Sequence, residues 1–239
     1  MKFEHLTIVI PVYNESDVIK STLDKIKELI LVPNTVLIVY DTPQDTTIPK
    51  VTEYIKNTKA TNILLMQNKY GRGALNAIKT GLESSGENPA LVTMADLSDD
   101  LCKVDKMLEL LNSDFDLVCG SRYMKGGKQI GGPWFKKTLS RVAGVSLHYL
   151  AGLPTHDITN SFKMYSPQVL KAITIESNGG FELGMEITIK AHFKGFKIAE
   201  IPTTWQDRTA GKSNFKLAQW LPRYIKWYIF ALKKHWLKK

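Results

Sequence analysis

The sequence is poor in cysteine and has no long apolar run. Only two of its 239 residues are cysteine, Cys102 and Cys119, which is too few for a disulfide framework and is typical of a reducing compartment. No stretch reaches the roughly 18 uncharged apolar residues that a membrane-spanning helix needs. The first apolar run, residues 6–12, has only the length of a strand, so we expect no secretory leader. These absences favour a cytoplasmic chain.

Acidic residues are absent from the C-terminal part of the chain. The formal net charge is +9, and nine Lys or Arg residues but no Asp or Glu follow Asp207. A basic segment of this kind predicts an anionic partner, which is a membrane surface, a phosphate group or a nucleic acid. The alternative is a basic tail that is only solvated.

The same segment has the pattern of an amphipathic helix. On a helical wheel the basic residues Lys216, Arg223 and Lys234 lie opposite an apolar side, with Trp220 and Trp227 at the border; the apolar side consists of Leu217, Leu221, Tyr224, Tyr228 and Leu232. This pattern is typical of a helix on an anionic membrane surface, and it contains no motif that reads nucleic-acid bases. We therefore expect a peripheral protein on the cytoplasmic face of a membrane, with Pro222 dividing the helix into two pieces. The alternative is that the helix packs against its own domain.

The first half of the chain alternates between strand and helix patterns. Apolar runs of strand length occur at residues 6–12, 35–40, 62–66, 90–94 and 115–120, and helical periodicity occurs at residues 19–30, 73–84 and 104–111. Asn14 or Ser16 is available to cap the first of these helices. The alternation predicts an α/β fold with a mostly parallel central sheet flanked by helices. We expect one catalytic domain over residues 1–214 and a basic amphipathic helix over residues 215–239.

Several carboxylates follow the predicted strands at their carboxyl ends. Asp41 follows the second strand, and Asp96, Asp99 and Asp100 follow the fourth, in the stretch VTMADLSDD. Because parallel strands end at one edge of a sheet, where α/β proteins bind ligands, we expect these carboxylates to converge there. A divalent cation would relieve the repulsion between these carboxylates. Carboxylate oxygens are hard ligands, which select Mg²⁺ or Mn²⁺. The bound cation would in turn hold a diphosphate. The alternative for Asp99 and Asp100 is to cap the helix that starts near Lys103.

Longer motifs occur in a fixed order between residues 8 and 216. They are IVIPVYNE, VYDTPQDTT, NKYGRGALNAIKTGL, MADLSDD, GSRY, HDITNSFKMYS and GGFELGMEITIKAHFKGFKIAEIPTTWQDRTAGKSNFK. In order and spacing they resemble the family 2 inverting glycosyltransferases, and most closely the dolichyl- or polyprenyl-phosphate sugar synthases. The resemblance implies a GT-A-like nucleotide-diphospho-sugar transferase fold. It also implies inverting transfer of a hexose from a donor of the GDP-mannose or UDP-glucose type to a polyprenyl phosphate, dolichyl or undecaprenyl.

The resemblance also implies roles for individual residues. Eight residues would bind the nucleotide sugar, the last two of them at the sugar: Pro11, Tyr13, Glu15, Asp41, Asn68, Arg72, Asp157 and Glu186. Asp96 would be the metal ligand from the family's Asp-x-Asp motif. Arg122, Arg208 and Lys212 would act with it in catalysis, around the phosphates or the acceptor.

The chain departs from the family's motifs at several positions. Met94 stands where the first carboxylate of Asp-x-Asp is usual, so we expect Asp99 or Asp100 to take its place. Asp99 is the better candidate, because Asp100 lies closer to the predicted helix start. In addition, the family usually has Gly-Phe-Arg after the position of Asp157, and this chain has Ser-Phe-Lys there, ending at Lys163.

The chemistry of the acceptor separates two enzymatic alternatives. Transfer to a saccharide hydroxyl needs a positioned base, whereas a phosphate monoester, with a second pKa near ~6, is already anionic at neutral pH. A site for a phosphate therefore needs cations, and the stretch DRTAGKSNFK supplies Arg208 and Lys212. We favour the polyprenyl phosphate acceptor. The alternatives are a saccharide hydroxyl and, because Met94 replaces a carboxylate, a non-catalytic membrane-associated protein.

Overall fold

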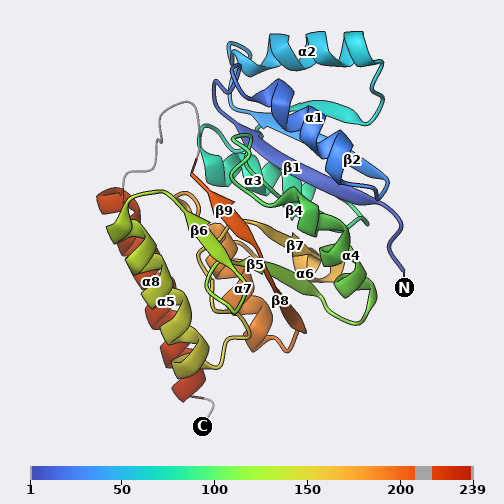
Figure 1. Cartoon of the computed structure of the whole chain (residues 1–239). Helices are drawn as coiled ribbons and strands as arrows, with labels where there is room; N and C mark the ends of the chain where they lie inside the picture. The colour runs from blue at the N-terminus through green and yellow to red at the C-terminus, as the bar shows by residue number, and fades with distance from the viewer. Residues whose placement is uncertain (1, 208–216, 238–239) are drawn as a thin grey trace.

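The computed structural model describes residues 2–207 and 217–237, which form a mostly parallel sheet between two layers of helices (Figure 1). The strands of the main sheet lie in the order β3-β2-β1-β4-β7-β5-β8. They are β1 (Leu6–Val12), β2 (Asn34–Tyr40), β3 (Ile63–Gln67), β4 (Ala90–Val92), β5 (Leu117–Ser121), β7 (Lys163–Tyr165) and β8 (Ile198–Pro202). Only β7 runs antiparallel to its neighbours, β4 and β5. The expected α/β fold with a mostly parallel sheet is confirmed.

Helices cover both faces of this sheet. They are α1 (Ile19–Leu29), α2 (Thr47–Thr58), α3 (Ala74–Glu83), the 3₁₀ turn η1 (Leu101–Lys103), α4 (Val104–Asn112), α6 (Pro167–Ala172) and α7 (Leu183–Phe193). Alternate side chains of β1 enter different cores, because successive residues of a strand point to opposite faces. Ile8 packs in the core under α1, α2 and α4, whereas Val9 packs in the core under α3, α6 and α7.

The first helix begins without the expected side-chain cap. Its N-cap residue is Val18, which makes no side-chain capping bond. Asn14 instead adopts a left-handed conformation, with φ of 57°, and its side chain accepts a hydrogen bond from the Thr46 backbone. The prediction of an Asn14 or Ser16 cap was wrong, because Asn14 is used to join two loops at the edge of the sheet.

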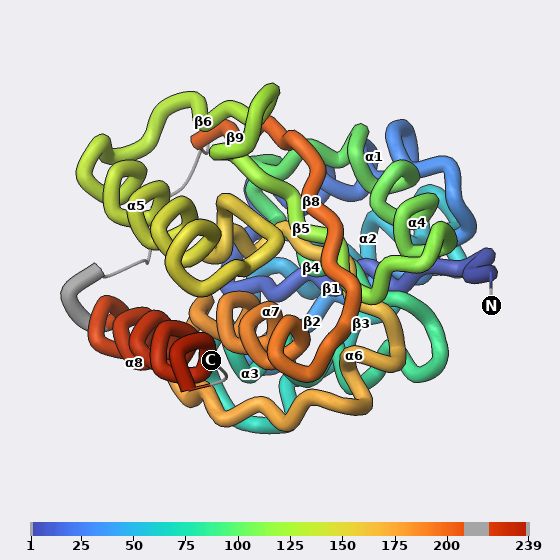
Figure 2. Tube along the Cα trace, turned by 90° about the horizontal axis from the view of Figure 1, so that it is seen from below, coloured from blue at the N-terminus to red at the C-terminus, as the bar shows by residue number. Residues whose placement is uncertain are grey.

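Two long helices lie side by side beyond the main sheet (Figures 1 and 2). They are α5 (Trp134–Ala151) and α8 (Leu217–Trp236), and a short parallel pair, β6 (Lys128–Ile130) with β9 (Thr204–Gln206), lies near α5. Trp227 and Ala231 of α8 are buried in a cluster that includes Leu147 of α5 and Ile189 of α7. None of the helices within the described ranges is long and apolar enough to cross a membrane.

The structure corrects two expectations for α8. The helix continues through Pro222, which lies in its second turn, where the ring removes one backbone donor without ending the helix. Trp227 was expected at a border facing the membrane, but only 2% of it is exposed. The helix packs through the side that carries Trp227 and Ala231, since α5 and α7 bury that side.

Candidate active site

The polar residues of the site follow the carboxyl ends of the parallel strands. Tyr13 follows β1, Asp41 follows β2, Asn68 follows β3, Asp96 lies beyond β4 and Arg122 follows β5. This is the edge at which α/β sheets bind ligands. The sheet order brings β1, β2, β3 and β4 together on one side, and β5 lies across β7 from them.

Asp41 anchors the glycine-rich turn after β3. Its carboxylate accepts hydrogen bonds from the Asn68 amide at 2.8 Å and from the Gly73 backbone N–H at 3.0 Å. Gly71 and Gly73 have φ of +81° and +131°, which side chains rarely tolerate, so the turn depends on glycine. Arg72, between these glycines, is exposed.

A second carboxylate, Asp45, holds the turn after β1. It accepts hydrogen bonds from the backbone N–H groups of Asn14 and Thr47, and the Thr47 hydroxyl accepts one from the Glu15 N–H. Tyr13 is left 56% exposed beside this turn. Pro11 and Glu15 are partly exposed at the same strand end, so these predicted nucleotide-binding residues do lie together.

Asp96 and Asp99 lie close together beyond β4. Asp96 accepts a hydrogen bond from the Ser98 N–H, and Asp99 accepts from the Thr93 hydroxyl at 3.0 Å and the Met94 N–H at 3.2 Å. Burial is the main cause that raises the pKa of Asp99 to about 6, and the charge of Asp96 also raises it. Two neighbouring carboxylates therefore lie beyond β4, and burial makes one of them, Asp99, harder to ionise.

The capping alternative is wrong for Asp99, whereas Asp100 does occupy the N-cap position of η1. Residue Asp100 precedes η1, but its side chain makes no capping hydrogen bond there. Its carboxylate lies near the Thr204 N–H, at 3.4 Å, while Asp99 bonds back to the end of β4. Both carboxylates are directed toward neighbouring segments instead of toward the helix start.

The donor set around Asp96 suits a magnesium-like ion. In the part of the chain that the structure describes, no group of three His, Cys, Asp or Glu side chains could hold a metal. Mg²⁺ usually takes only one or two protein carboxylates and completes its shell with substrate phosphates and water. Asp96 and Asp99 meet this requirement.

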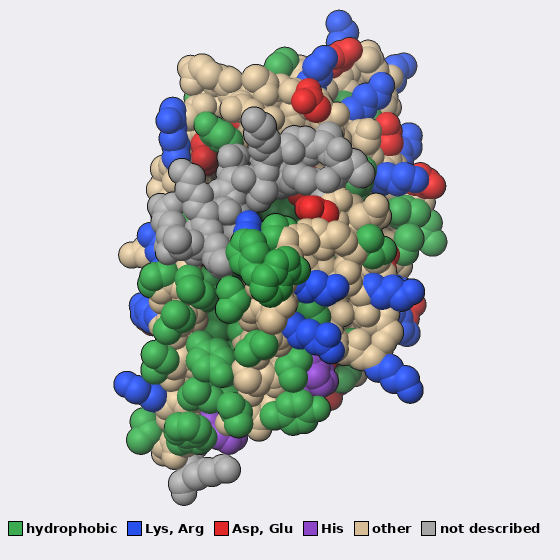
Figure 3. Space-filling model, turned by 60° about the vertical axis from the view of Figure 1, so that its left-hand side comes forward, with side chains coloured by type: hydrophobic (Ala, Val, Ile, Leu, Met, Phe, Trp, Pro, Cys, Tyr) green, Lys and Arg blue, Asp and Glu red, His purple; other side chains and the backbone are tan. Residues whose placement is uncertain are grey.

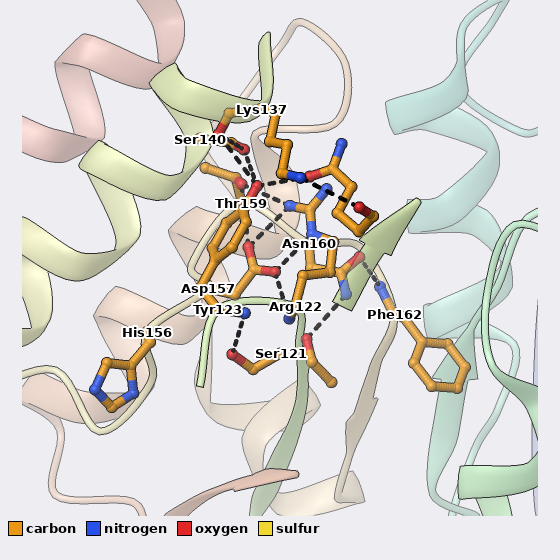
Figure 4. Close-up of polar contacts among 12 residues, drawn as sticks. Ser121, Arg122, Tyr123, Lys137, Ser140, His156, Asp157, Thr159, Asn160 and Phe162 are labelled. Carbon is orange, nitrogen blue, oxygen red and sulfur yellow. Dashed lines mark hydrogen bonds and ion pairs between the residues drawn. The ribbon is translucent and has the colours of Figure 1, made fainter. Parts of the chain in front are cut away.

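Arg122 and Asp157 form a buried, bidentate ion pair (Figure 4). Arg122 Nε and Nη2 donate to the two carboxylate oxygens at 2.6 and 2.9 Å, and the Arg122 backbone N–H donates a third bond at 3.0 Å. Burial alone would raise the pKa of Asp157, but the charge and hydrogen bonds of Arg122 outweigh burial and lower it. The Thr159 hydroxyl accepts from Arg122 Nη2 at 3.2 Å. The guanidinium is thereby fixed in one orientation.

A cationic cavity of about 410 Å³ lies beside Arg122. It is lined by Arg122, Tyr123, Met124, Gly127, Lys128, Gln129, Ile130, Lys137 and Arg141. Four of these side chains carry a positive charge, and none of the described lining residues is acidic. Tyr123 and Ser140 are hydrogen-bonded to each other, and Lys137 donates to the Gln129 carbonyl at 3.2 Å (Figure 4). An anion is the ligand that this cavity favours.

The backbone shapes one wall of this cavity. A side chain at Gly127 would collide with the carbonyl oxygens of Ser121 and Arg122, so only glycine lets the chain pass this close to the end of β5. Sequence reasoning missed Lys128, Lys137 and Arg141. The stretch GGKQIGG followed by a helix with paired lysines was the available signal.

The remaining predicted residues lie elsewhere. Glu186, on α7, is fully buried, and its oxygens accept from the backbone N–H groups of Glu176 and Ser177 and from Lys190. It therefore holds the segment before α7. Arg208 and Lys212, and also Lys216, lie outside the described residues.

Comparisons with known proteins agree with this architecture. The sequence model of the family described as Glycosyl transferase family 2 matches residues 7–174. The chain is 32% identical over 213 residues to an undecaprenyl-phosphate mannosyltransferase of Micrococcus luteus, covering 86% of this chain and 85% of that one. It is 30% identical over 130 residues to a polyprenol monophosphomannose synthase of Mycolicibacterium smegmatis, and that match spans about half, 49%, of each chain.

A solved structure shares the fold. Glucosyl-3-phosphoglycerate synthase from Mycobacterium tuberculosis, in complex with Mn²⁺, UDP-glucose and phosphoglyceric acid, superposes with a TM-score of 0.71. The alignment covers 96% of this chain and 80% of that one at 14% sequence identity. At this identity the likeness extends to the GT-A architecture alone.

Proposed function

The chain belongs to glycosyl transferase family 2, and from that membership we propose that it transfers a hexose from a nucleotide diphosphate sugar to a polyprenyl phosphate, with inversion. The observation that carries the proposal is the cavity lined by Arg122, Lys128, Lys137 and Arg141. Because the charge of Arg122 is balanced by Asp157, the excess positive charge comes from Lys128, Lys137 and Arg141, and this excess favours an anionic acceptor over a neutral sugar. The names of both curated relatives, a mannosyltransferase and a mannose synthase acting on prenyl phosphates, support the same acceptor class.

The donor side of the site would consist of the strand ends β1 to β4. Pro11, Tyr13, Glu15, Asp41, Asn68 and Arg72 surround the place proposed for a nucleotide of the GDP-mannose or UDP-glucose type. Asp96 and Asp99 would hold Mg²⁺ or Mn²⁺, which supplies positive charge for the leaving diphosphate. Mn²⁺ accompanies UDP-glucose in the mycobacterial synthase, which supports this assignment.

The acceptor phosphate would occupy the cationic cavity. One of its oxygens would attack the anomeric carbon from the side opposite the diphosphate, so that a new C–O bond forms while the bond to the diphosphate breaks. The configuration at that carbon would be inverted. No enzyme base is required, because the phosphate is anionic at neutral pH. Asp157 is in any case paired with Arg122, which makes it a poor base for a hydroxyl acceptor.

The position of the cavity on α5 supports a lipid acceptor in particular. Lys137 and Arg141 line the cavity from α5, and the same helix exposes apolar side chains next to them. The exposed apolar residues of α5 and α8 are Trp134, Phe135, Leu139, Val142, Tyr149, Leu150, Ile225, Ile229, Phe230 and Trp236. Figure 3 shows hydrophobic side chains gathered over this part of the molecule, with Lys and Arg at the edges. A prenyl chain leaving the cavity would meet this apolar surface.

The apolar surface of α5 and α8 is the part proposed to contact an anionic membrane. Exposed aromatic and aliphatic groups bordered by basic residues favour the headgroup region of a bilayer. We place the chain on the cytoplasmic face, where nucleotide sugars are available.

A donor and acceptor screen tests the proposal. The protein with Mg²⁺ is supplied with GDP-mannose or UDP-glucose and with either a short polyprenyl phosphate or a neutral saccharide. Nucleotide release together with a lipid-linked sugar of inverted configuration is the expected result. Transfer to the neutral saccharide alone would favour the hydroxyl acceptor, and no transfer with any pair would favour the non-catalytic alternative.

A further inference from the structure

One side of α8 faces the segment between α6 and α7, residues 174–182. Trp220, Arg223, Tyr224 and Trp227 are spaced as i, i+3, i+4 and i+7, so they share that side of the helix. This contact is separate from the exposed apolar surface of the same helix.

Trp227 makes the most specific contact with the segment. Its ring is 2% exposed, and its Nε1 donates a hydrogen bond to the Ser177 hydroxyl at 2.9 Å. Lys190 and Lys226 lie near the ring, at 5.0 and 5.1 Å from its centre. A buried indole N–H needs an acceptor, and Ser177 supplies it.

The segment is also held at its other end by α8. A side chain at Gly179 would collide with the Arg223 guanidinium, and one at Gly180 would come within 2.9 Å of the Trp220 ring. The N–H groups of both glycines donate to the Glu182 carboxylate, at 3.0 and 2.7 Å. The backbone of the segment therefore lies directly against α8, and Glu182 is fixed by that backbone.

The start of α7 connects this contact to the proposed active site. Gly184, two residues after Glu182, lies against the segment that carries Asp157, since a side chain at Gly184 would come within 3.8 Å of the Asn160 carbonyl oxygen. Asp157 is the ion-pair partner of Arg122. The segment held by α8 therefore leads directly into a helix start that packs beside the Arg122–Asp157 pair.

We propose that Trp227 is a positioning residue for sugar transfer: its hydrogen bond to Ser177, together with the bonds from the segment's backbone to Glu186, holds residues 174–182, including Glu182, next to the Arg122 side of the site. The inference rests on the proposed function. Trp227 acts without touching the substrate, through the backbone that orients Glu182. The helix that exposes an apolar surface would thus also set the shape of the transfer site.

The test compares variants that remove either partner of the hydrogen bond. Trp227→Phe keeps an aromatic ring but removes the N–H, and Ser177→Ala removes the acceptor. We expect each to lower kcat for transfer to a polyprenyl phosphate by about three- to tenfold, because loss of one buried hydrogen bond shifts the segment away from its held arrangement by about that factor. The double variant should show no larger loss than either single variant, since both remove the same bond. Nucleotide affinity should stay within twofold of wild type.

Tyr54→Phe is the matched control. Tyr54 is 5% exposed and donates to Asp24 at 2.9 Å between α2 and α1, so this variant also removes one hydrogen bond from a buried aromatic residue. It should lower thermal stability without changing kcat. Hydrogen exchange of the backbone amides of residues 176–182 gives a readout that needs no activity, and exchange should rise in Trp227→Phe and Ser177→Ala only.

The possible outcomes separate the two proposals. A wild-type protein that transfers no sugar would overturn the proposed function, while faster exchange at residues 176–182 in both variants would still support the holding role of Trp227. Unchanged kcat and unchanged exchange in Ser177→Ala would overturn the positioning role, even if Trp227→Phe fails to fold. Additive losses in the double variant would also overturn it.

Discussion

At the scale of single residues, the proposed metal site depends on Asp96 and Asp99, which lie close together beyond β4. By resemblance to the family's Asp-x-Asp motif, Asp96 would be a ligand, and Met94 stands where the first carboxylate is usual. Asp99 reaches back to the backbone of Met94 itself, so its carboxylate lies beside the position that lost one. The structure thus gives a geometric reason to prefer Asp99 over Asp100 as the replacement.

Asp96→Ala is expected to abolish transfer. Without this carboxylate the proposed cation loses its main protein ligand, and the charge on the leaving diphosphate is no longer balanced. Turnover should fall by at least about a hundredfold, and nucleotide binding should lose its dependence on Mg²⁺. Glu53→Ala, an exposed carboxylate on α2, is the control and should behave as wild type. Wild-type turnover in Asp96→Ala would contradict the assignment.

Asp99 should make stability depend on pH. Its folded-state pKa is about 6, above the value in an unfolded chain, so the folded protein binds the proton more tightly. Protonation of Asp99 therefore stabilises the folded protein most at low pH, and this stabilisation is lost as the pH rises from about 4 to about 6. The free energy of unfolding should fall by roughly 3 kcal/mol at most over this range. Urea unfolding at pH 4.5 and 7.5 without divalent ions should show this loss in the wild type and not in Asp99→Asn.

Mg²⁺ extends the same test. At pH 7.5 the ion should raise the stability of the wild type more than that of Asp99→Asn, because the ionised carboxylate binds it. At pH 4.5 the difference between them should shrink, since protonated Asp99 binds no cation. Asp100→Asn serves as the control and should respond to Mg²⁺ as wild type does. Equal Mg²⁺ responses in all three proteins would contradict a ligand role for Asp99.

At the same scale, the sequence predicted residues that follow strands better than residues brought in from elsewhere. Asp41 and Asp96 could be placed because a buried apolar run ends just before each of them. Lys137 and Arg141 could not, because their proximity to Arg122 depends on how α5 returns across the end of β5. No local pattern encodes that return.

At the scale of elements, α8 shows why a helical wheel could not predict which side of the helix packs against the protein. The wheel separated an apolar side from a basic side, but apolar residues occur on most of this helix. Trp227 and Ala231 pack inward, while Ile225, Ile229 and Phe230 stay exposed. Periodicity can show that a side is apolar, but it cannot say whether protein or lipid covers it. The five strands of the first half were predicted more accurately, because most are apolar runs with the composition of buried strands, whereas β7 and β8 of the same sheet were not predicted.

Substitution of exposed apolar residues on α8 tests the proposed membrane contact directly. Ile225→Ser with Ile229→Ser should weaken binding to anionic vesicles by about tenfold or more, because each half-exposed isoleucine loses roughly 1 kcal/mol of apolar burial. Sedimentation with vesicles at low and high salt measures the change. Leu31→Ser, an exposed leucine in the loop before β2, is the control. Deleting α8 would be less informative, since it would uncover Leu147 and Ile189.

Thermal unfolding of the same variants shows whether a change in vesicle binding comes from loss of folding. Both isoleucines are 44–46% exposed, so their replacement should leave the melting temperature close to that of wild type. Vesicle binding that is unchanged in the double variant would mean that another surface meets the membrane. A wild-type protein that ignores anionic vesicles at low salt would argue against membrane contact altogether.

At the scale of the whole molecule, two regions of opposite charge lie next to each other along the carboxyl edge of the sheet. Carboxylates gather beyond β1 to β4, whereas cations gather around the end of β5 and on α5. A metal-bound diphosphate suits the first region and a free phosphate suits the second. A sugar passing between them would cross the boundary between the β4 and β5 ends, near Asp99 and Arg122. The motifs of the first region lie in the part of the chain that the family model also matches, and the roles that the resemblance implies for their residues stay predictions.

The last prediction concerns the cations of the second region. Lys137→Gln and Arg141→Gln should each raise the KM for polyprenyl phosphate about ten- to a hundredfold, because each removes a charged contact worth ~1.5–3 kcal/mol. Binding of the donor nucleotide should not change, since these side chains lie on α5, away from β1 to β4. Lys56→Gln, an exposed lysine on α2, is the charge-matched control. The wild-type rate should rise with ionisation of the phosphate near pH ~6 and then stay level, because no enzyme base titrates above it. If both variants keep the wild-type KM for polyprenyl phosphate, the acceptor phosphate binds elsewhere.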